Sequence, residues 1–479
     1  MLSDGIKHSG IIRFFEEISA IPRGSYNEKA IADYLVEFAN KRGLEVYRDE
    51  LNNVLINMPA TVGYENTAPI LLEAHTDMVC EKNNDIEHDF LTEGLELYEE
   101  DGWIRARGTT LGADDGIGVA TMLYVLDGGI DEHPAIQCFF TSMEEVGMDG
   151  AKGFDYSRIF ARTMFSLDGN SPDEIVVGGS GGIRTNVRMS SVWEEYEAEP
   201  VCISIKGLCG GHSGEDVHKG RANANKLMGY ILLELSEKLS SDIRLVSLSG
   251  GSKDNAIPRE AEAVVLCNDN KLISCVREIE KDIMETLSEE DKDFRIETSK
   301  KEKKIYRCLD AKSTENIICF ISVITSGIIE MDKNISGVVE YSRNLGTMRT
   351  DEKGVEFVIS TRSGYEHRVD GSVRELDALA KALGGVCEHH SKYPGWKYSK
   401  VSPLRDRYCK AYEKRYGKPP IVMVIHAGLE CGVFTYHLPD LDIVSCGSVV
   451  VDLHSPDERL NKESIDRFFE VFADVIREK

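Results

Sequence analysis

The sequence predicts an α/β protein with a mostly parallel sheet and an inserted α+β domain. From residue 27 to about 180, apolar strand patterns alternate with amphipathic helix patterns, which is typical of a parallel sheet with helices on both faces. The pattern changes near residue 183 and returns after about residue 395. The chain has 479 residues, which exceeds a single hydrophobic core and indicates at least two domains.

The first part of the α/β domain is expected to comprise residues 1–184. It opens with an amphipathic helix that enters a Pro-Arg-Gly turn, and a second helical period stops at Gly43. Further along, apolar runs of strand length flank one more helical stretch. The expected strands are "LEVYRDELNNVLINMPA", "APILLEAHT", "AIQCFFTS" and "ARTMFSLDG", and "DDGIGVATMLYVLDGG" is the expected helix between the second and third.

Residues 185–395 are expected to form the inserted domain, and residues 396–479 the second part of the α/β domain. Strand alternation is clear in "GGIRTNVRMSSVWEEYEAEPVCISIKG" and is followed by a helix. The order strand, glycine-bearing loop, helix occurs at 201–238 and again at 355–385, which predicts two duplicated α+β units. The last part is predicted from the strand "DLDIVSCGS" and the closing helix "NKESIDRFFEVFADVIREK".

The composition restricts the class of partner and the cell compartment. A net charge of −26 disfavours nucleic acid and anionic membranes, which would both repel the chain. No apolar run has the length of a membrane span, and the N-terminus lacks the pattern of a signal peptide. The 12 cysteines are scattered without a CxxC pair, which is typical of reduced thiols. We therefore expect a cytoplasmic protein.

One strand is expected to end in a pair of polar residues. In "LLEAHTDMVC", His75 and Asp77 are two residues apart, so in a strand they project to the same side. A metal-bound imidazole usually has its other ring nitrogen held by a carboxylate or a carbonyl group. The pair is therefore either a metal ligand with its orienting neighbour or an ordinary hydrogen-bonded strand end.

Three more acidic groups follow predicted turns or strands. Asp114 and Asp115 precede a helix, Glu144 and Glu145 follow an apolar strand, and Asp168 follows another. Each has a simple alternative, such as helix capping for one of the aspartates or a solvated turn for the glutamates. Together they would gather negative charge at the carboxyl edge of one sheet, where α/β proteins bind ligands. His and carboxylate ligands suit zinc, manganese or cobalt, and their number suggests two ions.

Several motifs together resemble those of the aminoacyl-histidine dipeptidases, the carnosine-hydrolysing group of a metallopeptidase superfamily that includes glutamate carboxypeptidases and aminoacylases. The resemblance extends over essentially the whole chain. It implies a di-zinc peptidase domain with an inserted lid. The motifs are "EAHTDMVCEK", "GTTLGADDGIG", "TSMEEVGMDGA", "LDGN", "GGHSGEDVHKGRANA" and "LHSPDER".

The resemblance implies a role for each motif residue of the α/β domain. His75 and Asp168 would bind one zinc ion, Glu145 and His454 would bind the other, and Asp114 would bridge them. Cobalt or manganese could substitute for zinc.

Two further roles follow from the same motifs. Asp77 would orient His75, and Glu144 would be the general base. Many members of the family carry Asn directly after the bridging aspartate, whereas this chain carries Asp115. The doublet therefore leaves the position of the bridge open by one residue.

Two residues of the motif "VIHAGLECG" have alternative readings. His426 is the second choice for the place of His454, and Glu430 would either line the substrate pocket or be a plain loop acid.

In the inserted domain the resemblance implies substrate-binding residues. His212 would polarise the substrate carbonyl or stabilise the oxyanion, within its own chain or across a homodimer. Asn255 and Arg362 would hold the substrate backbone and carboxylate. The alternatives are a turn residue before Pro258 for Asn255 and a surface cation for Arg362.

The predicted function is the metal-dependent hydrolysis of dipeptides, including those that end in histidine. The partners would be a small peptide substrate and a second copy of the chain, with no nucleic acid and no membrane. Two alternatives stay open: an N-acyl amino acid hydrolase on the same scaffold, and an inactive homologue that serves as a binding module. The second would be expected to lose the base or the ligands, and all are present.

Overall fold

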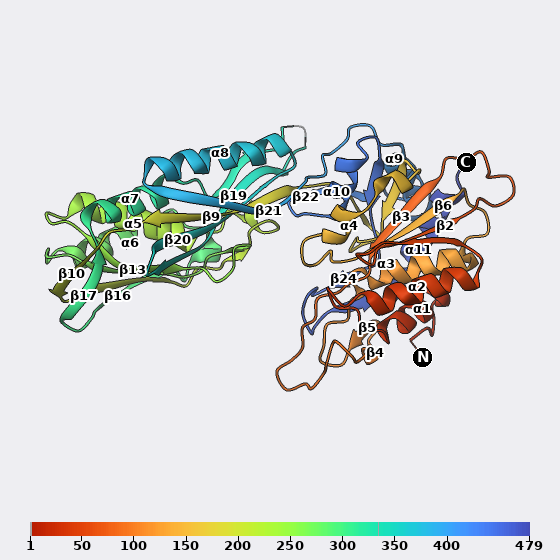
Figure 1. Cartoon of the computed structure of the whole chain (residues 1–479), viewed down its shortest axis with the longest axis horizontal. Helices are drawn as coiled ribbons and strands as arrows, with labels where there is room; N and C mark the ends of the chain where they lie inside the picture. Colours follow the sequence, from red (N-terminus) through yellow and green to blue (C-terminus); the bar gives the residue numbers. More distant parts are fainter. Residues whose placement is uncertain (1, 334) are drawn as a thin grey trace. The chain divides into compact units, whose positions relative to one another are not determined.

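The computed structural model describes residues 2–333 and 335–479. Contacts between residues divide the chain into two units (Figure 1). The first comprises Met1–Gly179, Trp396–Val424 and Leu429–Lys479, and the second comprises Ser180–Gly395 and Ile425–Gly428. The predicted insertion, 185–395, falls inside the second unit, and no local sequence pattern predicts the short second segment.

The first unit contains an eight-stranded mixed sheet. Its central strands β6, β3, β7 and β23 are parallel, whereas β1, β2 and β8 join by antiparallel pairing. The sequence predicts a mostly parallel sheet, but the parallel pairing joins these four central strands and the pairing of the other three is antiparallel. In order, the strands are β1 (Glu45–Arg48), β2 (Val54–Met58), β6 (Ile136–Thr141), β3 (Ile70–His75), β7 (Thr163–Ser166), β23 (Asp442–Ser445), β8 (Glu174–Gly179) and β22 (Ile421–Ile425).

Helices cover both faces of this sheet, as the continuous apolar runs of its central strands require. A small four-stranded sheet, of β4 (Leu97–Glu100), β5 (Trp103–Ala106), β25 (Arg459–Asn461) and β24 (Val450–Val451), completes the unit. The helices are α1 (Ser9–Ser19), α2 (Lys29–Lys41), α3 (Ala113–Tyr124), α4 (Asp149–Gly153), α9 (Pro403–Tyr416), α10 (Glu430–His437) and α11 (Lys462–Arg477).

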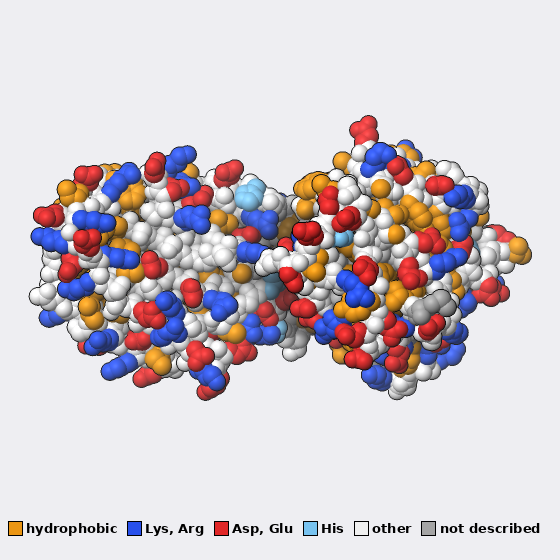
Figure 2. Space-filling view, turned by 90° about the horizontal axis from the view of Figure 1, so that it is seen from below, with side chains coloured by type: hydrophobic (Ala, Val, Ile, Leu, Met, Phe, Trp, Pro, Cys, Tyr) orange, Lys and Arg blue, Asp and Glu red, His pale blue; other side chains and the backbone are white. Residues whose placement is uncertain are grey.

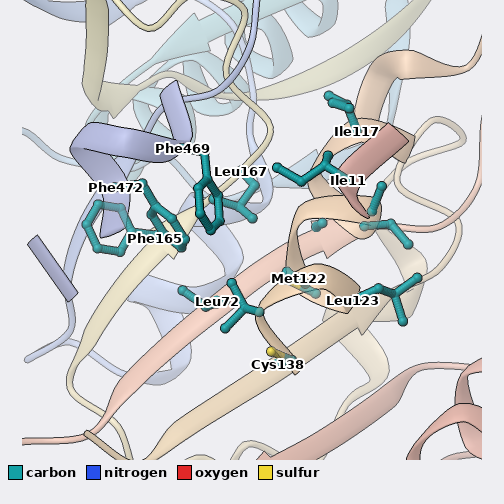
Figure 3. Packing of buried hydrophobic residues seen from close by; sticks show 14 of the residues in the cluster. Ile11, Leu72, Ile117, Met122, Leu123, Cys138, Phe165, Leu167, Phe469 and Phe472 are labelled. Carbon is teal, nitrogen blue, oxygen red and sulfur yellow. The ribbon is translucent and has the colours of Figure 1, made fainter. Parts of the chain in front are cut away.

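Strand alternation assigns side chains to the two faces. On one face, Leu72, Cys138 and Phe165 pack with α1, α3 and α11 in one core (Figure 3). The rings of Phe165 and Phe472 lie 5.1 Å apart, edge to face, a geometry that adds about 0.5–1.5 kcal/mol to the burial itself. The neighbouring Phe139 points the other way and meets α10. The residues of β3 and β7 that alternate with this core therefore face α10.

The second unit is built on an antiparallel nine-stranded sheet. Val187 and Met189 of β9 are buried, whereas the alternating Arg184 and Ser190 are exposed, so one face is covered. In order, the strands are β16 (Arg295–Lys300), β11 (Val201–Lys206), β15 (Ala261–Leu266), β13 (Arg244–Gly250), β19 (Val339–Asp351), β20 (Gly354–Ser363), β9 (Gly181–Ser190) and β21 (Gly385–Tyr393), and β18 (Gly327–Met331) also pairs with β19.

In the described part of the second unit, four α-helices and two short ribbons accompany this sheet. The rings of Phe320, on one of these helices, and Phe357, on β20, pack against each other with centroids 5.0 Å apart. This contact holds the helix against the sheet. The remaining elements are α5 (Ala224–Lys238), α6 (Leu272–Met284), α7 (Ala311–Val323), α8 (Glu366–Ala382), and the ribbons β10 (Trp193–Ala198) with β17 (Lys304–Leu309) and β12 (Gly211–His212) with β14 (Ala256–Ile257).

The surface carries charges of both signs. Acidic and basic side chains are interspersed over the face shown in Figure 2, so the net charge of −26 is not gathered there in one patch. Among the described residues, no helix is both long enough and apolar enough to cross a membrane.

Candidate metal centre

The predicted acidic groups lie where neighbouring strands of the first unit end. His75 is the last residue of β3, Glu144 and Glu145 follow β6, and Asp168 follows β7. Because β3 is parallel to both β6 and β7, these ends meet at one edge of the sheet. Asp114 reaches the same place from the start of α3. The site thus forms at the carboxyl edge of the parallel strands.

Asp114 lies between two histidines. Its Oδ1 is 3.0 Å from Nε2 of His75, and its Oδ2 is 3.3 Å from Nε2 of His454. His454 Nε2 is also 3.1 Å from Oε1 of Glu145. In the described chain, ligand atoms of His75, Asp114 and Glu145 all lie within 4.8 Å of one another and could hold a metal ion. One carboxylate therefore presents a different oxygen to each imidazole.

Asp77 holds the turn that carries the two glutamates. Its carboxylate accepts bonds from the backbone N–H groups of Glu144, at 3.0 Å, and Glu145, at 3.2 Å, and from the Ser25 hydroxyl, at 2.7 Å. His75 Nδ1 donates instead to the Asp77 main-chain carbonyl, at 3.1 Å, while the carboxylate is 3.7 Å away. Asp77 thus orients His75 mainly through its backbone.

Asp115 has a different role from its neighbour. Its Oδ1 accepts the backbone N–H of Gly118 at 3.1 Å, three residues on, which is the bond of a helix-capping aspartate. The side chain is buried, and burial raises its pKa well above the ordinary value. Asp114, not Asp115, faces the histidines.

Glu458 fixes the loop that carries Asp114. Its Oε2 accepts from the N–H groups of Leu111 and Gly112, at 2.8 and 2.9 Å, and its Oε1 from those of Ala113 and Asp114, at 2.8 and 3.3 Å. A carboxylate is favourable there because unpaired N–H groups at the start of a helix attract negative charge. Glu458 therefore connects the loop of His454 with that of Asp114.

Arg23 joins the same loop to the end of β3. It is 2% exposed, and its guanidinium donates to the carbonyl groups of Thr76, at 3.0 Å, and Gly112, at 2.5 Å. Burial lowers the pKa of Arg23, while Glu458 and Asp77 oppose this shift. Neither Arg23 nor Glu458 was predicted as a site residue, although Glu458 lies in the motif "LHSPDER".

Proton positions in the cation-free centre follow from burial and pairing. Burial opposes charge on His75, but the hydrogen bond to Asp114 and the nearby carboxylate of Asp77 raise its pKa well above the ordinary value. The carboxylates of Asp114 and Glu145, 3.3 and 3.1 Å from its Nε2, raise the pKa of His454 to about 10. Burial raises the pKa of Glu144 to about 8. Protons therefore occupy the site where no cation neutralises the carboxylates.

The donor set fits divalent cations. Oε1 of Glu145 is buried and, despite the nearby imidazole, accepts no hydrogen bond of good geometry. Burial and the negative charge of Asp114 raise the pKa of Asp168 well above its ordinary value. Metal ions would relieve both conditions, and imidazole with carboxylate is a common zinc donor set.

A second pair of acids lies deeper, under the site. Glu430 is not a loop acid: it begins α10, is 3% exposed and accepts a 2.6 Å bond from the Thr141 hydroxyl. Burial and the neighbouring Glu73 raise its pKa well above the ordinary value. Burial also raises the pKa of Glu73. Both carboxyls are therefore protonated more readily than exposed ones, which reduces their charge in the sheet interior.

In the second unit, two of the predicted substrate residues are neighbours around Gly214. An added Cβ on Gly214 would lie 3.3 Å from Arg362 Nε and 3.3 Å from His212 Cε1. His212 Nδ1 accepts the N–H of Glu215 at 3.1 Å. Burial and the charge of Arg362 lower the pKa of His212. The neutral ring therefore carries its proton on Nε2, where it can donate.

The other residues of this cluster are held by backbone and hydroxyl groups. The carbonyl of Asn255 accepts the N–H of Ser213 at 2.8 Å, next to His212. Arg362 Nη1 donates to the Tyr393 hydroxyl at 2.9 Å, and its Nε is buried without a partner. Arg362 is therefore not a surface cation.

His426, the alternative to His454, belongs to the second unit. Its Nε2 lies 2.7 Å from the Ser342 hydroxyl, and burial lowers its pKa to about 3. It is not paired with the acids around Asp114.

The chain is similar to known peptidases over nearly its whole length. A model of peptidase family M20/M25/M40 matches residues 71–478. Over 476 residues the chain is 37% identical to the cytosol non-specific dipeptidase of Escherichia coli strain K12, which covers 97% of this chain and 96% of that protein.

Solved structures extend the comparison. The aminoacylhistidine dipeptidase from Vibrio alginolyticus is similar, with a TM-score of 0.91 and 34% identity over 99% of this chain and 97% of the other. The aminopeptidase PepT from Bacillus cereus ATCC 10987, at 17% identity and a TM-score of 0.56 over 98% of both chains, shares the fold.

Proposed function

Because the chain belongs to peptidase family M20/M25/M40 and is a dipeptidase of that family, we propose that it hydrolyses dipeptides with two zinc ions and with Glu144 as general base. One observation supports this most strongly. The two carboxylate oxygens of Asp114 face His75 and His454 separately, at 3.0 and 3.3 Å. A carboxylate so placed is suited to bridge two cations.

His75 and Asp168 would hold one ion, Glu145 and His454 the other, and Asp114 both. Imidazole and carboxylate donors without thiolate also accept manganese or cobalt. Bound there, two divalent cations would supply an acidified water molecule and polarise the substrate carbonyl.

Glu144 would move the proton. It lies next to Glu145 in the turn held by Asp77. Burial raises its pKa to about 8 without cations, and nearby positive charge would lower this value, so Glu144 would be an unprotonated base in the loaded enzyme. It would accept a proton from the attacking water and return it to the leaving amine.

The second unit would bind the substrate. A neutral His212 with a proton on Nε2 would donate to the developing oxyanion. Arg362 would bind the free carboxylate of the dipeptide, since guanidinium pairs with carboxylate through two parallel N–H···O bonds. Asn255, whose carbonyl accepts the N–H of Ser213 beside His212, would hold the substrate backbone.

The names of two relatives indicate which dipeptides the enzyme would cleave. One similar protein is named a non-specific dipeptidase and the other an aminoacylhistidine dipeptidase, so we propose that dipeptides ending in histidine are among several substrates. We further propose a cytoplasmic location, from the cytosolic relative, and a homodimer.

A matched pair of variants tests the assignment of roles. Glu144→Gln should retain both metals while the rate falls by about 10²–10⁴-fold, because an amide cannot accept the proton. Glu145→Gln, one residue away, should lose metal because it removes a ligand. Elemental analysis and dipeptide turnover measure both effects, and the reverse pattern would exchange the two roles.

A substrate panel tests the reaction class. Free dipeptides should be cleaved and N-acetyl amino acids should not. Preferential cleavage of the N-acetyl compounds would instead support an N-acyl amino acid hydrolase.

A further inference from the structure

A second group of metal-binding side chains lies in the second unit. It consists of Asp377 on α8 and of Cys387 and His389 on the edge strand β21. One ligand atom from each, an oxygen, a sulfur and a nitrogen, lies within 4.8 Å of the other two. The residues proposed for catalysis include no sulfur, so this group differs from them in chemistry as well as in place.

Strand geometry explains how the group is assembled. Cys387 and His389 are two residues apart in β21 and project to the same side. Their intervening and flanking neighbours Val386, Glu388 and His390 are exposed, whereas these two are partly buried. They therefore lie on the side where α8 packs and brings Asp377.

The imidazole of His389 is already oriented for a cation. In the register of β21 with β9, His389 is opposite Thr185, and the Thr185 hydroxyl lies 2.9 Å from Nδ1. This contact turns Nε2 toward Asp377, whose Oδ1 is 3.0 Å away. Metal-bound histidines characteristically have the second ring nitrogen held in this way.

Asp377 supplies the negative charge of the group. Burial and then this charge raise the pKa of the Cys387 thiol to about 12. The Cys387 sulfur lies within 4.8 Å of an Asp377 carboxylate oxygen, so a cation placed among the three groups would contact both.

We propose that Asp377, Cys387 and His389 bind a zinc ion that links α8 to the edge strand of the sheet. Cys387 would lose its proton to solvent, and the His389 proton would move from Nε2 to Nδ1, facing Thr185. One thiolate and one carboxylate then balance the charge of Zn²⁺. Cysteine, histidine and aspartate are the ordinary zinc ligands, water would fill the fourth position, and thiolate disfavours magnesium and calcium.

Cobalt provides a selective test in the full-length chain. After removal of metals and loading with Co²⁺, only a site with a thiolate ligand should give a near-ultraviolet sulfur-to-cobalt charge-transfer band. We expect this band in the wild type and in Cys319→Ser, which changes a partly buried cysteine of α7. We expect Cys387→Ser to lose it.

Metal content gives an independent readout. Zinc-loaded Cys387→Ser should hold one ion fewer per chain than the wild type and Cys319→Ser, with dipeptide turnover unchanged. Asp377→Asn should bind the same ion more weakly and serves as the second variant if Cys387→Ser does not fold. Absence of the band in the wild type, its persistence in Cys387→Ser, or equal metal content in all chains would overturn the proposal, whatever the outcome for the catalytic residues.

Discussion

Replacing Glu458 with Gln should loosen the loop that carries Asp114. The carboxylate accepts four backbone N–H groups, two on each oxygen, at 2.8–3.3 Å. The amide of Gln keeps one oxygen, so two of the four buried donors would lose their acceptor and would face an NH₂ group instead.

The magnitude follows from those two donors. A buried polar group left without a partner costs about 1–3 kcal/mol, so the local cost is about 2–6 kcal/mol, and we take about 3. A free energy of this size corresponds to roughly a 100-fold change in an equilibrium constant. If the loop must be ordered to present Asp114, metal affinity should fall by about the same factor.

Hydrogen exchange and metal titration measure this directly. In the metal-free chain, amides of residues 111–113 should lose about 100-fold of their protection, and titration against a competing chelator should show the weaker affinity. Asp457→Asn is the matched control, because this exposed acid is the preceding residue and undergoes the same chemical change. Exchange and affinity in Glu458→Gln that equal those of the control would refute the reasoning.

Three further results are expected. Asp114→Asn should reduce metal content far more than Asp115→Asn, because only Asp114 faces the histidines; elemental analysis showing the opposite would move the bridge by one residue. Metal affinity should fall as pH falls, since His454, with a pKa of about 10 in the cation-free centre, must release a proton to bind; calorimetry in two buffers should detect that proton, and its absence would contradict the proposed ligand. Arg362→Lys should weaken activity toward free dipeptides but add little loss for amidated ones, because lysine lacks the two-pronged contact; equal cleavage of free and amidated dipeptides by the wild type would remove the basis for this contact.

The strand ends could be predicted from the sequence because apolar runs and polar ends have local patterns. The runs that end at His75 and before Asp168 became β3 and β7, and both belong to the parallel centre of the sheet. The antiparallel pairing of β8 with β23 could not be predicted, since the two strands are far apart in the sequence. No local pattern states which distant strand completes a sheet edge.

Glu458 and Arg23, which hold the loops of the site, could not be predicted for a different reason. Glu458 and Arg23 bind backbone groups, the first at positions 344 to 347 residues away. Every residue but proline offers the same N–H and every residue the same carbonyl, so the partners have no signature in the sequence. The assignment of His454 required a resemblance to a family, because a single histidine in a loop is uninformative by itself.

The division of the chain also bears on how this fold can be recombined. The second unit takes its residues from two separate stretches, Ser180–Gly395 and Ile425–Gly428. A chimaera that exchanges only the long stretch with a relative would leave the tetrapeptide Ile425–Gly428 of the old parent inside the new module. His426, the hydrogen-bond partner of Ser342, lies in that tetrapeptide. Functional grafts between relatives should therefore transfer both stretches together, and natural exchange of this module by one insertion event is correspondingly constrained.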